Sequence, residues 1–271
     1  MTTVDELLAG AGARPLRGWD FSWLGDRVRT EPPPWDFAAI VAGRAAHSPD
    51  LLDLGTGGGE FLASLPHRPP RTVATEAWPP NVDVAAQRLE PLGVEVVHVE
   101  PAPDNLDQGP DERRGRLPFG DASFSLVAGR HEAYVAAEVA RVLAPGGSFV
   151  TQQLGGDYAS AYEALGLEAP CRRVFDLAVA RAQLERAGLA VQQAAEGETT
   201  TTFADAGAFA WYLRAVPWAV DGFAIERHRE SLGRLQERIG AEGPLVVRDH
   251  AFWLAAAHPA EPLSFRADVP L

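Results

Sequence analysis

Short apolar runs alternate with longer amphipathic stretches through most of the chain after residue 49. The apolar runs predict strands at 50–55, 72–76, 94–100, 123–129, 148–154, 190–198 and 244–258. Apolar residues with helical spacing predict helices at 81–92, 132–143 and 174–189. Strands that alternate with helices indicate an α/β fold with a doubly wound, Rossmann-like sheet.

The two ends of the chain depart from this alternation. Residues 1–48 mix aromatic side chains with prolines, and 35–47 has helical spacing after the helix-breaking run Pro32-Pro33-Pro34. Residues 203–240 are helical in pattern, with an interruption near Pro217. We therefore expect one compact unit of three parts: a helical N-terminal cap at 1–48, a core at 49–154, and a remainder at 155–271 with a helical insertion at about 200–240.

The charge and the cysteine count narrow the possible partners and chemistries. The formal net charge is −13, and all 24 basic residues are arginine. An acidic surface repels phosphate backbones, so no nucleic-acid partner is expected. The missing lysine excludes a lysine general base. Because Cys171 is the single cysteine, a disulfide within the chain and a four-cysteine zinc site are excluded.

The termini and apolar runs predict a cytoplasmic protein. Asp5 and Glu6 stand where a signal peptide would have basic and then apolar residues. The apolar run at 251–257 is too short to span a bilayer. We expect no membrane association, and either a monomer or a homodimer.

The stretch Asp53-Leu-Gly-Thr-Gly-Gly-Gly-Glu60 has four glycines in five positions between a predicted strand and a helix. Glycines there let the backbone approach a ligand closely. A triphosphate-binding loop requires a lysine after its last glycine, and the chain has none. A dinucleotide-binding loop has glycine or alanine where Glu60 stands, and a glutamate opposes pyrophosphate at a helix N-terminus. A purely structural glycine turn is the remaining alternative.

The positions of Asp53, Gly55, Gly57 and Gly59 resemble motif I of class I S-adenosylmethionine-dependent methyltransferases. Residues 117–134 resemble the Leu-Pro-Phe-x-Asp-x-Ser-Phe-Asp-Leu-Val segment of the bacterial methyltransferase type 11 group, with Ser125 in place of its second Asp. Residues 139–150 resemble the helix, Pro-Gly-Gly turn and fifth strand of that group. The resemblance implies a seven-stranded sheet with its last strand antiparallel. It also implies S-adenosylmethionine as cofactor, with S-adenosylhomocysteine as product, and no metal.

An acid for the cofactor ribose is expected at the end of the second predicted strand, where Glu76 lies 19 residues after Gly57. The alternative is a solvated surface acid. Trp78 is expected to cover adenine or to lie in the core. Asp104 with Asn105 is favoured over Asp107 as the acid beside adenine. The implied cofactor site comprises Asp53, Gly55, Thr56, Gly57, Gly59, Glu76, Ala77, Trp78, Asp104, Asn105 and Arg130.

The methyl acceptor of this fold binds beyond the carboxyl ends of the strands, where Arg130, His131 and Glu132 follow the fourth predicted strand. His131 suits a neutral-pH base, and Glu132 orients it or acts itself. The alternative is that both residues only cap and pack at a helix start. The expected acceptor-binding residues are Trp19, Trp23, Gln152, Tyr212 and Trp218.

The predicted function is methylation at carbon, nitrogen or oxygen of a small acceptor, aromatic or a natural product of secondary metabolism. Aromatic residues at both flanks of the core favour a planar acceptor. The alternatives are an RNA or protein methyltransferase and a non-catalytic protein that binds S-adenosylmethionine.

Overall fold

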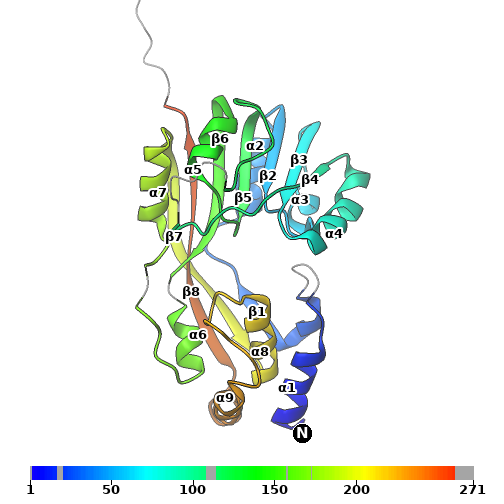
Figure 1. Ribbon diagram of the computed structural model, residues 1–271, viewed down its shortest axis with the longest axis vertical. Helices are drawn as coiled ribbons and strands as arrows, with labels where there is room; N and C mark the ends of the chain where they lie inside the picture. The colour runs from blue at the N-terminus through cyan, green and yellow to red at the C-terminus, as the bar shows by residue number, and fades with distance from the viewer. Residues whose placement is uncertain (1, 17–20, 108–113, 157, 172, 260–271) are drawn as a thin grey trace, which may run out of the picture.

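The computed structural model describes residues 2–16, 21–107, 114–156, 158–171 and 173–259 (Figure 1). Its strands are β1 (Val28–Glu31), β2 (Asp50–Leu54), β3 (Arg71–Glu76), β4 (Glu95–His98), β5 (Phe124–Arg130), β6 (Leu143–Gly155), β7 (Ala190–Phe203) and β8 (Leu245–Ala257). Its helices are α1 (Val4–Ala13), α2 (Phe37–Ala45), α3 (Glu60–Ser64), α4 (Pro79–Leu89), α5 (Ala136–Val142), α6 (Ala159–Ala164), α7 (Leu177–Arg186), α8 (Ala206–Ala215) and α9 (Arg229–Glu242). Two 3-10 helices, η1 (Ser22–Arg27) and η2 (Glu90–Leu92), complete the elements.

The strands form one mixed sheet in the order β1-β7-β8-β6-β5-β2-β3-β4. Strands β2, β3, β4, β5 and β6 are parallel neighbours, whereas β8 is antiparallel to both β6 and β7. The register pairs Asp53 of β2 with Ala74 of β3 and Ala128 of β5. The carboxyl ends of these three strands therefore meet at one edge of the sheet, on either side of the glycine loop.

Helices cover both faces of this sheet, as a doubly wound fold requires. On one face, α2, α3 and α4 contribute side chains such as Val41, Leu62 and Leu89 to a buried cluster. On the other face, α5 and α7 contribute Val139 and Leu184 to a second cluster. The prediction of a doubly wound α/β sheet with an antiparallel last strand is confirmed.

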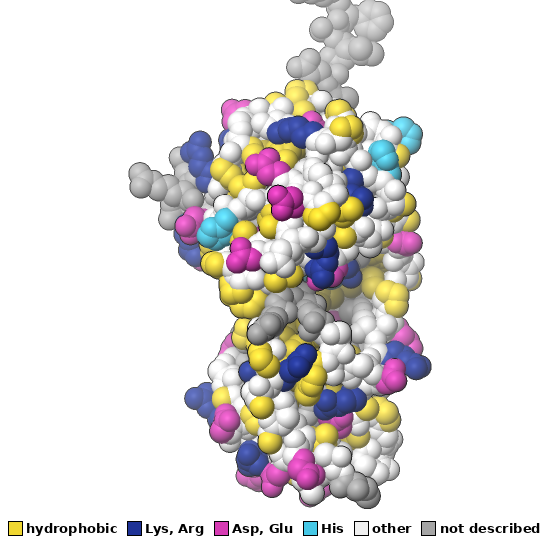
Figure 2. Space-filling view, turned by 90° about the vertical axis from the view of Figure 1, so that its right-hand side faces the viewer, with side chains coloured by type: hydrophobic (Ala, Val, Ile, Leu, Met, Phe, Trp, Pro, Cys, Tyr) yellow, Lys and Arg dark blue, Asp and Glu magenta, His cyan; other side chains and the backbone are white. Residues whose placement is uncertain are grey.

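A second lobe lies below the doubly wound part in Figure 1, and β7 and β8 run through both. Its core is a third buried cluster, to which α1, α6, α8 and α9 contribute side chains such as Leu8, Tyr162, Phe209 and Leu235. Seven of the ten residues of α8 are buried. Figure 2 shows the molecule narrowing between the two lobes.

The sheet has eight strands, so the predicted number of seven is one too few. The additional strand is β1, which pairs antiparallel with β7, Val28 opposite Phe203. Only one of its four residues, Val28, is apolar, so no alternation of apolar residues indicated a strand within the expected helical cap. Its place beside β7 depends on backbone pairing with a distant segment of the chain.

An ion pair joins this part of the chain to the start of α8. Arg27 donates from Nε and Nη2 to the two carboxylate oxygens of Asp205, over 2.8 and 2.6 Å. Asp205 is also the N-cap of α8, and its Oδ1 accepts a hydrogen bond from the Ala208 N–H. One carboxylate thus caps the helix and attaches the segment that leads into β1.

We expect Gly207→Ala to destabilise the protein by about 1–3 kcal/mol, because a Cβ there would overpack the contact between α8 and α1. That Cβ would lie 2.7 Å from the backbone oxygen of Leu7 and 3.0 Å from its carbonyl carbon. Gly233→Ala is the matched control, since a Cβ at this α9 position meets nothing within 4 Å. The control should gain up to about 1 kcal/mol from helix propensity. Urea unfolding measures both, and equal stability of the two variants would contradict this packing.

Candidate cofactor site

The glycine loop between β2 and α3 has a backbone that side chains disfavour. Gly55, Gly57 and Gly59 have φ values of +60°, +63° and +81°, in the left-handed region. A Cβ on Gly55 would lie 2.2 Å from Cγ of Glu132, and one on Gly59 would lie 2.8 Å from Cγ of Leu89. Glycine is therefore required by both conformation and close approach.

The loop is held from its outer side. Arg88 of α4 pairs with Glu60 and donates to the Gly58 carbonyl. The Thr56 N–H donates to the Thr75 carbonyl of β3 over 2.8 Å. Glu60, the residue that excluded the phosphate ligands, is thus engaged with α4.

Three carboxyl groups gather at the strand ends around this loop. Asp53 is the second-last residue of β2, Glu76 is the last residue of β3, and Glu132 follows β5. Burial and the charge of Glu76 raise the pKa of Asp53 to about 7, although the Thr56 hydroxyl and Arg130 oppose this shift. Burial and the charges of Glu76 and Asp53 likewise raise the pKa of Glu132 to about 7. Because these carboxylates repel one another where little water screens them, this edge of the sheet favours a bound cation.

Glu76 fixes the turn after β3. Its Oε1 accepts hydrogen bonds from the N–H groups of Ala77 and Trp78, over 2.9 and 2.8 Å. Its Oε2 has no hydrogen-bond partner in the part of the chain that the structure describes. Trp78, expected over adenine or in the core, is 45% exposed, so it does not lie in the core.

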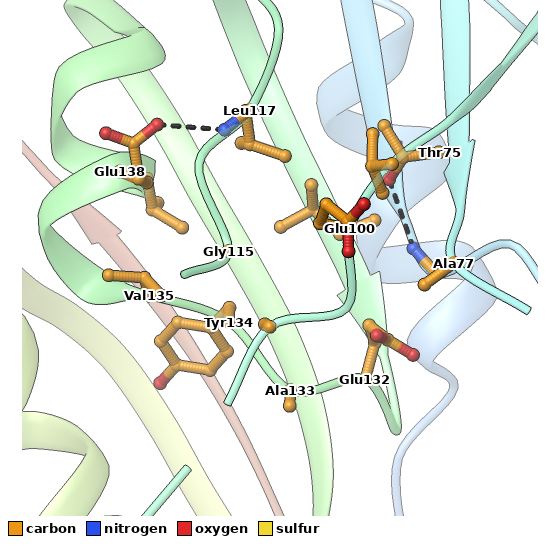
Figure 3. A pocket seen from close by; sticks show the side chains of 15 residues that line it. Thr75, Ala77, Glu100, Gly115, Leu117, Glu132, Ala133, Tyr134, Val135 and Glu138 are labelled. Atoms are coloured by element: carbon orange, nitrogen blue, oxygen red, sulfur yellow. Dashed lines mark hydrogen bonds between the residues drawn. The ribbon is translucent and has the colours of Figure 1, made fainter. Parts of the chain in front are cut away.

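A cavity opens beside these groups, between β3, the segment after β4 and the start of α5. Its lining includes Gly55, Ala77, Glu100, Glu132 and Tyr134. Figure 3 shows Ala77, Glu100 and Glu132 among the residues around this cavity. Glu100 was not among the predicted residues. It is the first acid after β4, whereas the sequence prediction placed the strand at 94–100 and favoured the later acid Asp104.

Asp104 and Asn105, favoured as the adenine neighbours, do not line this cavity. The Asn105 side chain accepts a hydrogen bond from the Tyr134 N–H over 3.1 Å, and its carbonyl accepts one from Gln183 over 2.6 Å. Asp104 accepts from the Leu106 N–H within its own turn. Both side chains therefore stabilise the loop itself. Sequence spacing did not distinguish this role from ligand contact.

His131 is held by Gln152 of the neighbouring strand β6, and the side chain of Gln152 is held in turn by Trp35. Its N–H donates to the Gln152 carbonyl over 2.8 Å, and its Nε2 lies 3.1 Å from Nε2 of Gln152. The Trp35 indole N–H donates to Oε1 of Gln152 over 2.7 Å. Desolvation of the ring and the charge of Arg130 lower the pKa of His131 to about 4, so the imidazole is neutral at pH 7.

Arg130 is the basic residue nearest to the carboxyl groups. Its guanidinium lies 5.6 Å from the centre of the Phe61 ring and stabilises the charge of Asp53 at longer range. It forms no ion pair with a described residue. Its donors are thus available to an anionic ligand group.

Three of the predicted acceptor-binding aromatics, Trp23, Tyr212 and Trp218, lie in the second lobe. Trp23 packs 5.7 Å from Trp211, and Tyr212 packs 5.2 Å from Phe203. Trp218 is half exposed and donates to the Tyr158 hydroxyl over 3.0 Å. Trp19 lies outside the described residues. The structure thus gives Trp23 and Tyr212 packing partners in the core of this lobe, and their contact with an acceptor stays a prediction.

Asp249 is a buried carboxyl group on β8, where the strand passes from the second lobe to the first. The residue is 8% exposed, and its carboxylate makes no hydrogen bond or ion pair with any residue in the described ranges. Burial raises its pKa to about 6. Its charge also acts on Tyr212, whose pKa is raised chiefly by burial. No pattern in the sequence indicated this group.

Two further findings concern ligands and environment. Within the described ranges, no three His, Cys, Asp or Glu side chains are grouped so as to hold a metal ion. None of the described helices is long and apolar enough to cross a membrane.

Comparisons with known proteins agree with this geometry. Residues 52–151 match a family model described as a methyltransferase domain. No curated protein matches the chain. A putative methyltransferase from Bacillus halodurans C-125 is 19% identical with a TM-score of 0.55, covering 82% of this chain and 99% of that one. The YcgJ protein from Bacillus subtilis is 17% identical with a TM-score of 0.56, covering 82% and 98%. A functionally unknown protein from Deinococcus radiodurans R1 is 13% identical with a TM-score of 0.53, covering 88% and 97%. At these identities the solved structures show a shared fold.

We expect Asp249→Asn to stabilise the protein at pH 8 by about 1–3 kcal/mol and to have little effect at pH 4. The folded carboxyl group has a pKa of about 6, above its ordinary value of 3.8, so the folded state holds the proton more tightly. The free-energy cost of burying the ionised Asp249 carboxylate is absent below about pH 4. It grows as the pH rises to about 6 and reaches its full value above that pH. Denaturant unfolding at both pH values measures it. Asp83→Asn, at an exposed position of α4, is the control, and an equal effect of the two variants would contradict the burial argument.

Proposed function

Residues 52–151 belong to the methyltransferase domain family, and on this premise we propose that the protein transfers a methyl group from S-adenosylmethionine to a small acceptor. The observation that carries the proposal is the group of three carboxyl groups, Asp53, Glu76 and Glu132, around the glycine loop. This methyl donor carries an ammonium and a sulfonium, and it has no phosphate. A bound cation relieves the repulsion between the carboxylates of such a site, whereas pyrophosphate would add to that repulsion.

The chain offers a suitable group for each part of the cofactor. Gly55 and Gly57 provide backbone without a Cβ, and Asp53 and Glu132 suit the ammonium. Arg130 suits the carboxylate of the amino-acid end, by a charge-assisted hydrogen bond. Thr56 places a hydroxyl at the loop that is buried without a hydrogen-bond partner of normal geometry among described residues.

The nucleoside part fits the side of β3 and β4. The Oε2 atom of Glu76 is available to ribose hydroxyls. Ala77, Trp78 and Glu100 are the candidates beside adenine, and Glu100 supports this better than Asp104 because it lines the cavity. These assignments supply groups for the nucleoside without a metal.

S-adenosylmethionine, when bound, supplies a methyl carbon on a positively charged sulfur. The residues around the site align the acceptor and exclude water, which is the main requirement of an in-line displacement. The acceptor atom forms its bond to carbon as the carbon–sulfur bond breaks with both electrons going to sulfur. An acceptor that bears a proton on this atom must lose it to a base. Glu132, which a bound cation keeps in its ionised form, is the candidate for that role at neutral pH.

A small acceptor is favoured over RNA by the charge of the chain. The net charge is −13, and arginine and acidic side chains are interspersed on the face seen in Figure 2. Aromatic side chains of the second lobe, including Trp23, Tyr212 and Trp218, support a planar acceptor. We expect it to lie between the lobes, beside the cofactor.

Calorimetry with S-adenosylmethionine and with NAD tests the cofactor class, and heat is expected with the first alone. Mass spectrometry of aromatic metabolites incubated with protein and S-adenosylmethionine then seeks the gain of one CH2 unit. Binding without any methyl transfer would favour a non-catalytic protein that binds this cofactor. Absence of binding would refute the proposal.

We expect Glu76→Gln to weaken S-adenosylmethionine binding by about 1–3 kcal/mol, because a charged acceptor for the ribose is lost. The glutamine oxygen retains the bonds to Ala77 and Trp78, so the turn is preserved. Asp83→Asn is the control, since it removes an exposed carboxylate of α4 that does not hold the glycine loop. Calorimetry should show an affinity within about 3-fold of wild type for the control. Unchanged affinity in Glu76→Gln would dismiss the ribose contact.

The affinity for S-adenosylmethionine should fall about 10-fold or more as the pH is lowered from 7.5 to 6. Asp53 and Glu132 have pKa values of about 7 in the free protein, and a bound cation favours their ionised forms. Binding near pH 6.5 should therefore release protons, which calorimetry in buffers of different ionisation enthalpy detects. In Asp53→Asn the affinity should be lower and its dependence on pH shallower. A wild-type affinity that is constant over this range would contradict the linkage.

A further inference from the structure

The contacts of Gln152 determine which nitrogen of His131 carries its proton. Gln152 lies 4% exposed between the Trp35 indole and the His131 ring. The indole N–H can only donate, so the amide oxygen of Gln152 must face Trp35, as the 2.7 Å contact shows. The amide nitrogen of Gln152 then faces His131, and it too can only donate. Nε2 of His131 therefore accepts, and the proton of the neutral ring is on Nδ1.

The backbone holds the ring in this place. His131 has φ of +60°, an uncommon value for a residue other than glycine. Its N–H donates to the carbonyl of the same Gln152 over 2.8 Å. One residue of β6 thus fixes both the main chain and the ring. Within the described residues, Nδ1 has no hydrogen-bond partner, and the residue is exposed.

We propose that Trp35 and Gln152 are positioning residues that hold His131 with its proton on Nδ1, so that His131 binds the acceptor molecule as a hydrogen-bond donor. This inference rests on the proposed function and deepens it. The lone pair of Nε2 is engaged by Gln152, so the ring has no free lone pair with which to act as a base. The acceptor class that fits carries an oxygen or unprotonated nitrogen close to the methylated atom, such as a carbonyl or a ring nitrogen, which accepts the Nδ1–H.

The first test reads the proton directly and requires no ligand. Long-range ¹H–¹⁵N correlation spectra of protein labelled with ¹⁵N-histidine distinguish the two neutral forms of a ring. The chain has seven histidines, and the signals that disappear in His131→Asn identify the one concerned. At pH 7.5 we expect His131 to carry its proton on Nδ1 in the wild type. A proton on Nε2 would overturn the proposal.

Two variants test whether Trp35 and Gln152 position the His131 ring. Trp35→Phe removes the indole donor, and Gln152→Leu removes the link, so both should shift His131 toward the form protonated on Nε2. Trp253→Phe is the matched control. It loses an indole from β8 opposite Gln152, in the same buried cluster, without a hydrogen bond to that glutamine. An unchanged His131 signal in Gln152→Leu would overturn the positioning role even if the wild type has the expected form.

The second test separates a donor from a base in turnover of whichever aromatic compound gains a CH2 unit. Asparagine tolerates a left-handed backbone and has an N–H donor attached to Cγ, as Nδ1 is in histidine. A donor role predicts that His131→Ala lowers kcat/KM about 10-fold, and that His131→Asn stays within about 3-fold of wild type. A base role predicts an equal loss of about 100-fold or more in both. An equal loss in the two variants, of any size, contradicts the donor role.

The two proposals can fail separately. If calorimetry finds no binding of S-adenosylmethionine, the proposed function fails while the spectra still report the form of the ring. If the cofactor binds normally and the ring carries its proton on Nε2, only the positioning role of Trp35 and Gln152 fails.

Discussion

The desolvation of carboxyl groups at the carboxyl ends of β2, β3 and β5 is the constraint on which the site depends. Parallel strands bring their ends together at one edge, so any acids located there repel one another across a short distance. Asp53 and Glu132 reduce this repulsion by holding their protons up to about pH 7. A bound cation removes it, so the same feature that opposes ionisation in the free protein favours a positively charged ligand.

The absence of side chains in the glycine loop allows the carboxyl groups to lie this close to it. Glu132 packs directly over Gly55, so any larger residue there would displace the carboxyl group from the loop. Arg88 holds the loop from the opposite side through Glu60 and the Gly58 carbonyl. The positive group nearest to the acids, Arg130, is not paired with any of them in the described part of the chain. It can therefore attract the anionic end of a ligand whose other end is cationic.

The sequence contains the local signals of the core, and these were sufficient for its fold. Apolar runs and helical spacing predicted the sheet from β2 to β8, because all of these strands except β4 bury apolar residues of their own. β1 was missed since its place is determined by backbone pairing with β7, for which Arg29, Thr30 and Glu31 carry no apolar signal. The same limit applies to side-chain roles. Asn105 and Glu100 are both polar residues after β4, and only the tertiary structure distinguishes the one that bonds to the Tyr134 N–H from the one that lines the cavity.

Several residues that would recognise an acceptor lie outside the segment that matches the methyltransferase domain, whereas His131 lies within it. Gln152 follows the last matched residue, and Trp35 precedes the first by 17 positions. The aromatic cluster of the second lobe is formed by residues still farther away in the chain. Strands β7 and β8 extend the sheet beyond its doubly wound part into the second lobe. A family pattern confined to the five strands of the parallel core and their loops can therefore identify the methyl donor. Recognition of the acceptor depends on contacts such as that of Trp35 with Gln152, which lie 117 residues apart in sequence.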